Sequence, residues 1–187
     1  MPRAGLSTTA VVDAALDVVD AHGPDALTLA AVAGRTGVAA PSLYKHVGSL
    51  AELRALVGVR VMDQLTERLT AAVMGRSRAE AVAALMHTCR AYVVEHPGRY
   101  AAMPMDPLHD PALAEAGQRL VAVFLAVLRG YGLRGSAAVH ATRCLRAIVH
   151  GFVSLEAAGG FGLPEKLDRT YEQLVAMFTA SLPNPQE

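Results

Sequence analysis

The segment from Thr28 to His46 has the outline of two short helices joined by a tight turn. Thr28 can accept a hydrogen bond from a free N–H group at the start of the first helix, and Pro41 has a φ angle already set for the first turn of the second. The residues that let the two helices turn and approach closely are small: Ala33, Gly34 and Gly37. This is the outline of a helix-turn-helix, whose second helix lies in a DNA major groove.

The rest of the chain has the periodicity of amphipathic helices and no convincing strand pattern. Besides the two helices of the motif and a short helical turn near residues 99–103, we expect helices over residues 7–22, 49–75, 77–96, 112–131, 136–158 and 164–181. The predicted fold class is therefore all-α, with about nine helices. The first of them would complete a three-helix DNA-binding domain over residues 1–48, and residues 49–187 would form a helical bundle.

The long helix that follows the motif has a clear start signal. Ser49 with Glu52 three residues later forms a capping box, in which each side chain satisfies a free backbone N–H at the helix start. We expect this helix to connect the DNA-binding domain to the bundle.

The formal net charge is zero, with 17 basic and 17 acidic residues, so overall charge does not indicate a nucleic-acid partner. The placement of charge is more informative. Most acids of the N-terminal segment precede Thr28, whereas the second helix of the motif and its flanks hold Lys45, His46 and no acid. The charge pattern is neutral overall and favourable to DNA locally.

Targeting and membrane signals are weak in this chain. The longest apolar stretch, residues 120–128, is far too short to span a bilayer. Acidic residues interrupt the N-terminal helix, so we expect no signal peptide and a cytoplasmic protein. We expect Cys89 and Cys144, both in apolar helical patterns, to be buried inert thiols, with a redox switch between them as the alternative.

We predict no catalytic activity, no cofactor and no metal site. The sequence has no Ser-His-Asp spacing, phosphate-binding loop or paired-carboxylate motif. Its seven histidines are scattered and none has the i, i+4 partner that a helical metal site needs.

The order of residues in the first 55 positions resembles one family. The match rests on the run Pro41–Ser49 followed by Glu52-Leu53, and on a set of earlier pairs and a glycine: Ala14-Ala15, Gly23, Leu27-Thr28, Val32-Ala33 and Gly37-Val38. With these residues the chain resembles the tetracycline-repressor (TetR) family of bacterial transcriptional regulators. Residues 145–164, which include His150-Gly151, resemble one class of TetR-type ligand-binding domains, although Val149 stands where an aromatic residue often precedes the His-Gly pair.

The resemblance implies a homodimer that places two reading helices, each about six residues long, on the halves of a near-palindromic operator, about 35 Å apart. It also implies a C-terminal domain that binds a small-molecule inducer and, more often than not, a repressor rather than an activator. We expect the last two long helices to pair with their counterparts, using residues such as Leu155, Leu174 and Phe178. Two other readings stay open: a helix-turn-helix protein without a ligand, and an all-helical carrier or enzyme.

The candidate DNA-contacting residues lie in and around the second helix of the motif. Ala40 could touch a thymine methyl group and Ser42 could donate to a base edge. Tyr44, Lys45 and His46 suit phosphate contacts, although Tyr44 and His46 could equally pack and cap. The full predicted set is Thr28, Ala40, Pro41, Ser42, Tyr44, Lys45, His46 and Ser49. Leu50 stands where many relatives have a basic residue after the reading helix, and Ala30 also offers no charge. We therefore expect weaker anchoring to the DNA backbone than is usual in the family.

The candidate inducer site is an apolar cavity between helices of the bundle. Methionine fills irregular spaces and suits adaptable binding surfaces, although plain core packing explains any single one. The predicted lining residues are Met62, Met86, Cys89, Met103, Phe124 and His150. Such a cavity would favour a largely hydrophobic, neutral or weakly acidic inducer, which would enter behind residues 103–111 and tilt the helix that starts at Ser49.

Overall fold

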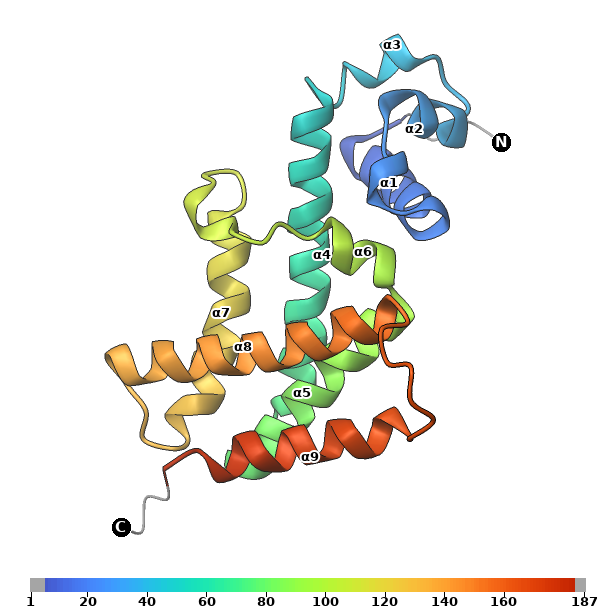
Figure 1. Ribbon diagram of the computed structural model, residues 1–187. Helices are drawn as coiled ribbons and strands as arrows, with labels where there is room; N and C mark the ends of the chain where they lie inside the picture. Colours follow the sequence, from blue (N-terminus) through green and yellow to red (C-terminus); the bar gives the residue numbers. More distant parts are fainter. Residues whose placement is uncertain (1–5, 184–187) are drawn as a thin grey trace. The chain divides into compact units, whose positions relative to one another are not determined.

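The computed structural model describes residues 6–183, and all regular secondary structure in that range is helical (Figure 1). The predictions of an all-α fold and about nine helices are confirmed for this range. The α-helices are α1 (Thr8–His22), α2 (Leu29–Thr36), α3 (Ala40–Leu43), α4 (Leu50–Val73), α5 (Arg78–Glu95), α6 (Pro97–Ala102), α7 (Ala114–Arg129), α8 (Gly135–Ala157) and α9 (Leu167–Ala180). Two short 3₁₀ helices, η1 (Pro24–Ala26) and η2 (Pro107–His109), lie between them.

The chain folds into two compact units. The N-terminal unit comprises the residues up to Asp63 and His96–Gly117, and the C-terminal unit comprises Gln64–Glu95 and the residues from Gln118 onward. Contacts thus group part of α4 and the α6 region with the helix-turn-helix. The predicted domains 1–48 and 49–187 stay a prediction, and their outermost residues, 1–5 and 184–187, lie outside the described residues.

Helix α1 is the element against which the N-terminal unit is assembled. Ser7 caps it, since its hydroxyl accepts a 3.1 Å hydrogen bond from the N–H of Ala10. The buried face of α1 includes Val11, Ala15 and Val19. Its opposite face holds three aspartates, each of which binds an arginine from a different helix: Asp13 with Arg60 of α4, Asp17 with Arg35 of α2, and Asp20 with Arg99 of α6.

Helix α6 packs closely against α1. A Cβ atom added at Gly98 would lie 2.4 Å from the carbonyl oxygen of Val19, so only glycine fits this contact. Beside it, Arg99 donates from Nε and Nη2 to the carboxylate of Asp20, at 2.9 and 2.6 Å. The expected helical turn near residues 99–103 therefore begins earlier, at Pro97, and belongs to the N-terminal unit.

In the C-terminal unit, α5, α8 and α9 pack against one another (Figure 1). Aromatic rings meet between them, with the centroids of Phe152 and Tyr171 4.8 Å apart. Arg90 of α5 donates from Nε and Nη2 to Glu156 of α8, at 2.8 and 2.6 Å, and from Nη1 to Asp168 of α9, at 2.9 Å. Its guanidinium also lies over the rings of Phe152 and Tyr171, 5.4 and 5.0 Å from their centroids. One arginine thus joins three helices.

Three side chains of the C-terminal unit bear on the sequence predictions. Cys89 is buried, and burial raises the pKa of its thiol to about 12, so the thiol stays protonated and unreactive near neutral pH. Cys144 is exposed on α8, so the prediction that it is buried is wrong. Phe178, expected at the dimer interface, is buried in the core of its own unit, because its side chain lies on the same face of α9 as Tyr171 and Val175.

Candidate nucleic-acid interface

The first helix of the predicted motif forms as the sequence indicates. The hydroxyl of Thr28 accepts a 3.1 Å hydrogen bond from the N–H of Ala31 and caps α2. The helix ends at Gly37, whose φ of 71° lies in the left-handed region that favours glycine. The N–H of Val38 then returns to the carbonyl of Ala33, at 3.2 Å, and turns the chain toward α3.

The second helix is shorter than the six residues expected. Helix α3 covers only Ala40–Leu43, and a turn follows in which the N–H of Val47 still bonds to the carbonyl of Leu43, at 3.0 Å. Leu43 and Val47 are 0% and 1% exposed, so they fix this turn in the core. Tyr44, between them, is 58% exposed and its ring stands in solvent.

A hydrogen bond also ties the turn to α1. The hydroxyl of Thr8 donates to the carbonyl oxygen of His46, at 3.2 Å. Together with the buried leucine and valine, this bond fixes the backbone that presents Tyr44 and Lys45, so both side chains project from a rigid support.

None of the eight predicted DNA-contacting residues is buried. Thr28, Pro41, Tyr44, Lys45 and Ser49 are exposed, whereas Ala40, Ser42 and His46 are half-buried. They belong to α2, α3, the turn after α3 and the start of α4, all within the N-terminal unit. We call these eight residues the reading surface. Their contact with DNA stays a prediction.

The ion pairs between α1 and the neighbouring helices determine which basic side chains of this unit remain without a carboxylate partner. Arg35, Arg60 and Arg99 are each paired with an α1 aspartate. Among the described residues of the unit, the lysine and arginine side chains without a carboxylate partner are Lys45 and Arg54. Although acidic residues outnumber basic ones in this unit, Lys45 therefore offers a cation at the reading surface.

The start of α4 differs from the expected capping box in one detail. Ser49 caps the helix by accepting a 3.1 Å hydrogen bond from the N–H of Glu52. The carboxylate of Glu52, however, accepts from the N–H of Gly48, at 2.8 Å, one residue before the cap. A negative charge thus lies at the helix start beside Ser49, one of the predicted DNA-contacting residues, and it disfavours a phosphate there.

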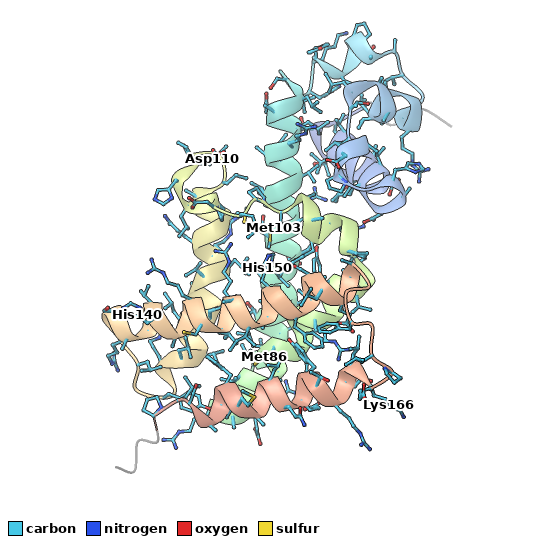
Figure 2. The ribbon with its side chains drawn as sticks, in the orientation of Figure 1. Met86, Met103, Asp110, His140, His150 and Lys166 are labelled. Carbon is cyan, nitrogen blue, oxygen red and sulfur yellow. The ribbon has the colours of Figure 1, made fainter. Side chains whose placement is uncertain are left out.

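The predicted inducer-site residues divide between the two units. Met62 and Met103 belong to the N-terminal unit, whereas Met86, Cys89, Phe124 and His150 belong to the C-terminal unit; Figure 2 labels three of them, Met103, Met86 and His150. Met62, Met86 and Cys89 are buried, and the other three are half-buried. A cavity shared by all six stays a prediction.

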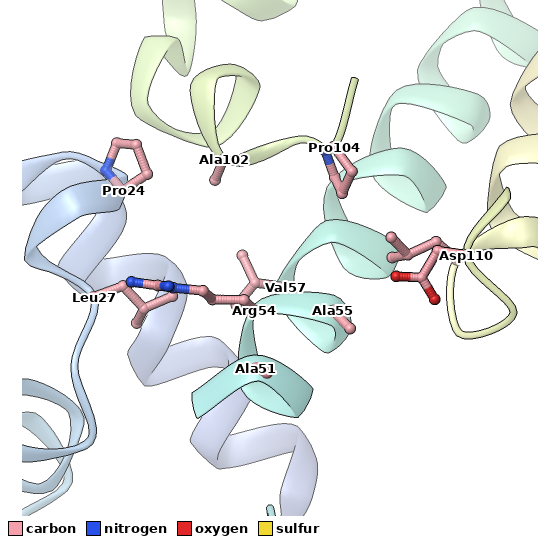
Figure 3. Close-up of a pocket in the computed structure, with 10 residues that line it drawn as sticks. Pro24, Leu27, Ala51, Arg54, Ala55, Val57, Ala102, Pro104 and Asp110 are labelled. Atoms are coloured by element: carbon pink, nitrogen blue, oxygen red, sulfur yellow. The ribbon is translucent and has the colours of Figure 1, made fainter. Parts of the chain in front are cut away.

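A cavity that the sequence did not indicate lies within the N-terminal unit, with a volume of about 290 Å³ (Figure 3). Its lining residues are Pro24, Leu27, Ala51, Arg54, Ala55, Val57, Ala102, Pro104, Asp110 and Leu113. They come from four segments that are distant in the sequence, which is why no local pattern predicted them. Arg54 is the residue that draws attention to this cavity, because it lines the wall and has no carboxylate partner among the described residues. That lack of a partner can be recognised only in the three-dimensional structure.

Within residues 6–183, no helix combines the length and apolar character needed to cross a bilayer. The same range contains no cluster of three or more His, Cys, Asp or Glu side chains placed to hold a metal ion.

Comparison with protein families gives two matches on this chain. Residues 11–56 match the tetR family of bacterial regulatory proteins. Residues 82–178 match the tetracyclin repressor-like C-terminal domain, so that this second match alone covers more than half of the chain.

Two curated relatives are similar over most of their length. The uncharacterised HTH-type transcriptional regulator Rv0681 of Mycobacterium tuberculosis is 40% identical over 158 residues, which is 83% of this chain and 72% of the relative. The uncharacterised HTH-type transcriptional regulator YobS of Bacillus subtilis is 31% identical over 183 residues, which is 97% of this chain and 95% of the relative.

Solved structures share the fold. A protein of unknown function from Rhodococcus sp. RHA1 has a TM-score of 0.83 at 21% identity, covering 98% of this chain and 100% of its own. The TetR-Q116A protein of Acinetobacter baumannii, solved in complex with minocycline, has a TM-score of 0.72 at 20% identity, covering 94% and 96%.

Proposed function

The chain belongs to the TetR family of bacterial transcriptional regulators, and from this premise we propose that it is a dimeric repressor of a near-palindromic operator. In the proposal, a small inducer binds the C-terminal ligand-binding domain and releases the operator. The observation that carries it is the rigid support of the reading surface, in which buried Leu43 and Val47 hold exposed Tyr44 and Lys45.

One copy of the reading surface cannot supply the affinity of a specific operator complex. Lys45 is its lysine, and a single neutralised phosphate contributes little at physiological salt. Two copies one helical turn of DNA apart double the contacts and add the geometric requirement of two half-sites. Anything that changes the separation of the copies then weakens binding, which is how an inducer would act.

The proposed dimer pairs α8 and α9 with the same helices of a second copy. The side chains that support this are the exposed apolar residues of these helices: Val139, Leu155 and Met177. Leu174 is half-buried and can contribute its outer edge, whereas Phe178 belongs to the core of its own unit. Cys144 also faces outward on α8, so it would report on this interface.

The decisive experiment is selection of bound fragments from random DNA, followed by binding measurements with Tyr44→Ala and Lys45→Ala on the selected site. If Lys45 neutralises a phosphate, its removal makes the fall of log affinity with log salt less steep by about two, one for each copy. Lys166→Ala is the matched control, since Lys166 is an exposed lysine of the C-terminal unit. An unchanged slope for Lys45→Ala contradicts its phosphate role, and unaffected binding by Tyr44→Ala contradicts the reading surface.

The carboxylate at the start of α4 gives an independent test of the Ser49 contact. Glu52→Gln keeps an oxygen that can accept from the N–H of Gly48 but removes the charge. If Ser49 and the start of α4 approach a phosphate, this variant binds the operator several-fold more tightly at low salt. An unchanged affinity would show that no phosphate lies near Ser49.

The dimer is tested by sedimentation combined with thiol labelling. We expect a stable dimer at micromolar concentration, in which Cys144 reacts more slowly than in dilute, monomeric protein. A monomer at micromolar concentration would contradict both the dimer and the two-half-site mechanism.

The inducer is proposed to be a largely hydrophobic small molecule, neutral or weakly acidic. The minocycline complex of the Acinetobacter neighbour supports a small-molecule pocket in this fold. A thermal-shift screen of the full chain against such compounds, followed by loss of operator binding for any hit, would identify it. If no compound both stabilises the protein and releases the DNA, the result would instead favour a constitutive repressor without an inducer.

A further inference from the structure

The cavity in the N-terminal unit has the chemistry of a small-ligand site. Its walls are mostly apolar, formed by the α4 residues Ala51, Ala55 and Val57 and by side chains of η1, α6 and the loop that follows α6. Its volume of about 290 Å³ lies at the lower end of the roughly 300–1,000 Å³ typical of small-molecule pockets. It therefore suits a compact ligand rather than a large one.

A charged group stands at each end of the cavity. Figure 3 shows the side chain of Arg54 running from α4 toward Leu27, at one end, and the carboxylate of Asp110 at the other. Asp110 is fixed in place, because its Oδ1 accepts a 2.9 Å hydrogen bond from the N–H of Ala112.

Arg54 differs from the neighbouring arginines of its unit. Arg35, Arg60 and Arg99 all bind carboxylates of α1 at 3.0 Å or less. Within the part of the chain that the structure describes, no carboxylate lies within ion-pair distance of Arg54. Its side chain lines a cavity with mostly apolar walls, and a guanidinium beside apolar walls suits a carboxylate with an apolar body.

We propose that this cavity binds a short-chain apolar monocarboxylate, with the carboxylate on Arg54 and the hydrocarbon chain against Leu27, Val57 and Leu113. Asp110 at the far end repels a second carboxylate, so the site selects monocarboxylates over dicarboxylates. The site lies within the N-terminal unit, and none of the six residues predicted for the inducer site lines it; four of those six belong to the C-terminal unit.

Binding there has a mechanical consequence. The ligand would contact α4, η1, α6 and the loop after α6 at once, and so link the start of α4 to the α6 region. A molecule that binds only the folded unit raises its stability in proportion to ligand concentration and affinity.

The test uses the full chain and three six-carbon probes: hexanoate, adipate and hexylamine. Calorimetric titration is expected to give saturable hexanoate binding, with a dissociation constant on the order of 1 mM. Adipate should bind several-fold more weakly, and hexylamine should not bind. Methyl NMR signals of Leu27, Val57 and Leu113 should shift, whereas those of Leu85 and Val82 in the C-terminal unit should not.

Four variants locate the binding. Arg54→Gln should weaken hexanoate about tenfold or more, because a charge-assisted hydrogen-bonded pair is lost. Ala55→Phe should fill the cavity and abolish binding. Asp110→Asn should leave hexanoate unchanged and remove the discrimination against adipate. Arg60→Gln, which makes the same charge change on the same helix outside the cavity, is the control.

Three results would overturn the proposal. These are no saturable hexanoate binding to the wild type, unchanged binding by Arg54→Gln together with Ala55→Phe, or methyl shifts confined to the C-terminal unit. The last result would assign the carboxylate to the inducer site of the C-terminal domain instead, and it leaves the proposed operator function untouched.

Discussion

The two units use arginine in different ways. In the N-terminal unit, the pairs of Arg35 with Asp17 and Arg60 with Asp13 are open to solvent, with side chains between 33% and 59% exposed. In the C-terminal unit, Arg90 and Glu156 are 15% and 14% exposed, and the guanidinium lies over two aromatic rings. Water screens the exposed pairs of the N-terminal unit more than the buried Arg90–Glu156 pair. Each exposed pair should therefore contribute little to stability, and the loss of the buried pair should cost much more.

The largest expected effect comes from breaking that strong pair. Arg90→Met leaves Glu156 buried without its cation and should lower the free energy of unfolding by roughly 3 kcal/mol. Arg68→Met is the control, since Arg68 pairs with Glu95 in the same unit with both side chains about half exposed, and it should cost less than about 1 kcal/mol. Urea unfolding measures both. Equal losses would show that burial does not separate the two kinds of pair.

The close contact between α1 and α6 should give the next effect. Gly98→Ala places a Cβ atom against the carbonyl oxygen of Val19, so the backbone must shift, at about 2 kcal/mol. Gly34→Ala, in α2, meets nothing within 4 Å and should stabilise the protein by about 0.5 kcal/mol, since alanine favours helix. If both substitutions had the same sign, the N-terminal unit would not depend on this contact.

Two buried tyrosines provide a matched pair within the C-terminal unit. The hydroxyl of Tyr171 donates to the carbonyl of Met86 at 2.7 Å, so Tyr171→Phe should cost about 1 kcal/mol. The hydroxyl of Tyr131 is buried with no hydrogen-bond partner among the described residues, so Tyr131→Phe should be neutral or slightly stabilising. Thermal unfolding of the two variants checks this, and a larger loss for Tyr131→Phe would contradict it.

The smallest effects are expected at the α1 aspartates. Asp20→Asn removes the pair with Arg99, whose side chains are 33% and 18% exposed, and should cost about 1 kcal/mol. Asp17→Asn removes the more exposed pair with Arg35 and should change stability by less than about 0.5 kcal/mol. Hydrogen exchange of α6 amides should speed up in the first variant alone, because only Asp20 binds α6.

Local signals in the sequence were sufficient for most of the fold. Ser7, Thr28 and Ser49 cap helices because each can reach an N–H a few residues ahead, and Gly37 ends α2 because it accepts a positive φ. Such features depend on neighbours in sequence, so periodicity and turn chemistry locate them.

Features that depend on distant neighbours were not predictable. Arg99 and Asp20 are 79 positions apart, and no pattern in either segment indicates that they meet. The same holds for Cys144, which the helical pattern predicted to be buried, for Phe178, which we expected at a dimer interface, and for the cavity at Arg54. The length of α3 was overestimated because the turn after Leu43 keeps a helical hydrogen bond without remaining a helix.

The α1 ion pairs have a consequence for how operator binding is counted. Added salt screens DNA phosphates, but it also screens the aspartate–arginine pairs that hold α2, α4 and α6 on α1. Part of the loss of affinity with salt would then come from loosening of the protein rather than from ion release on the DNA. A phosphate count taken directly from the slope would be too high, and the excess would disappear in a variant whose pairs have been replaced by apolar contacts.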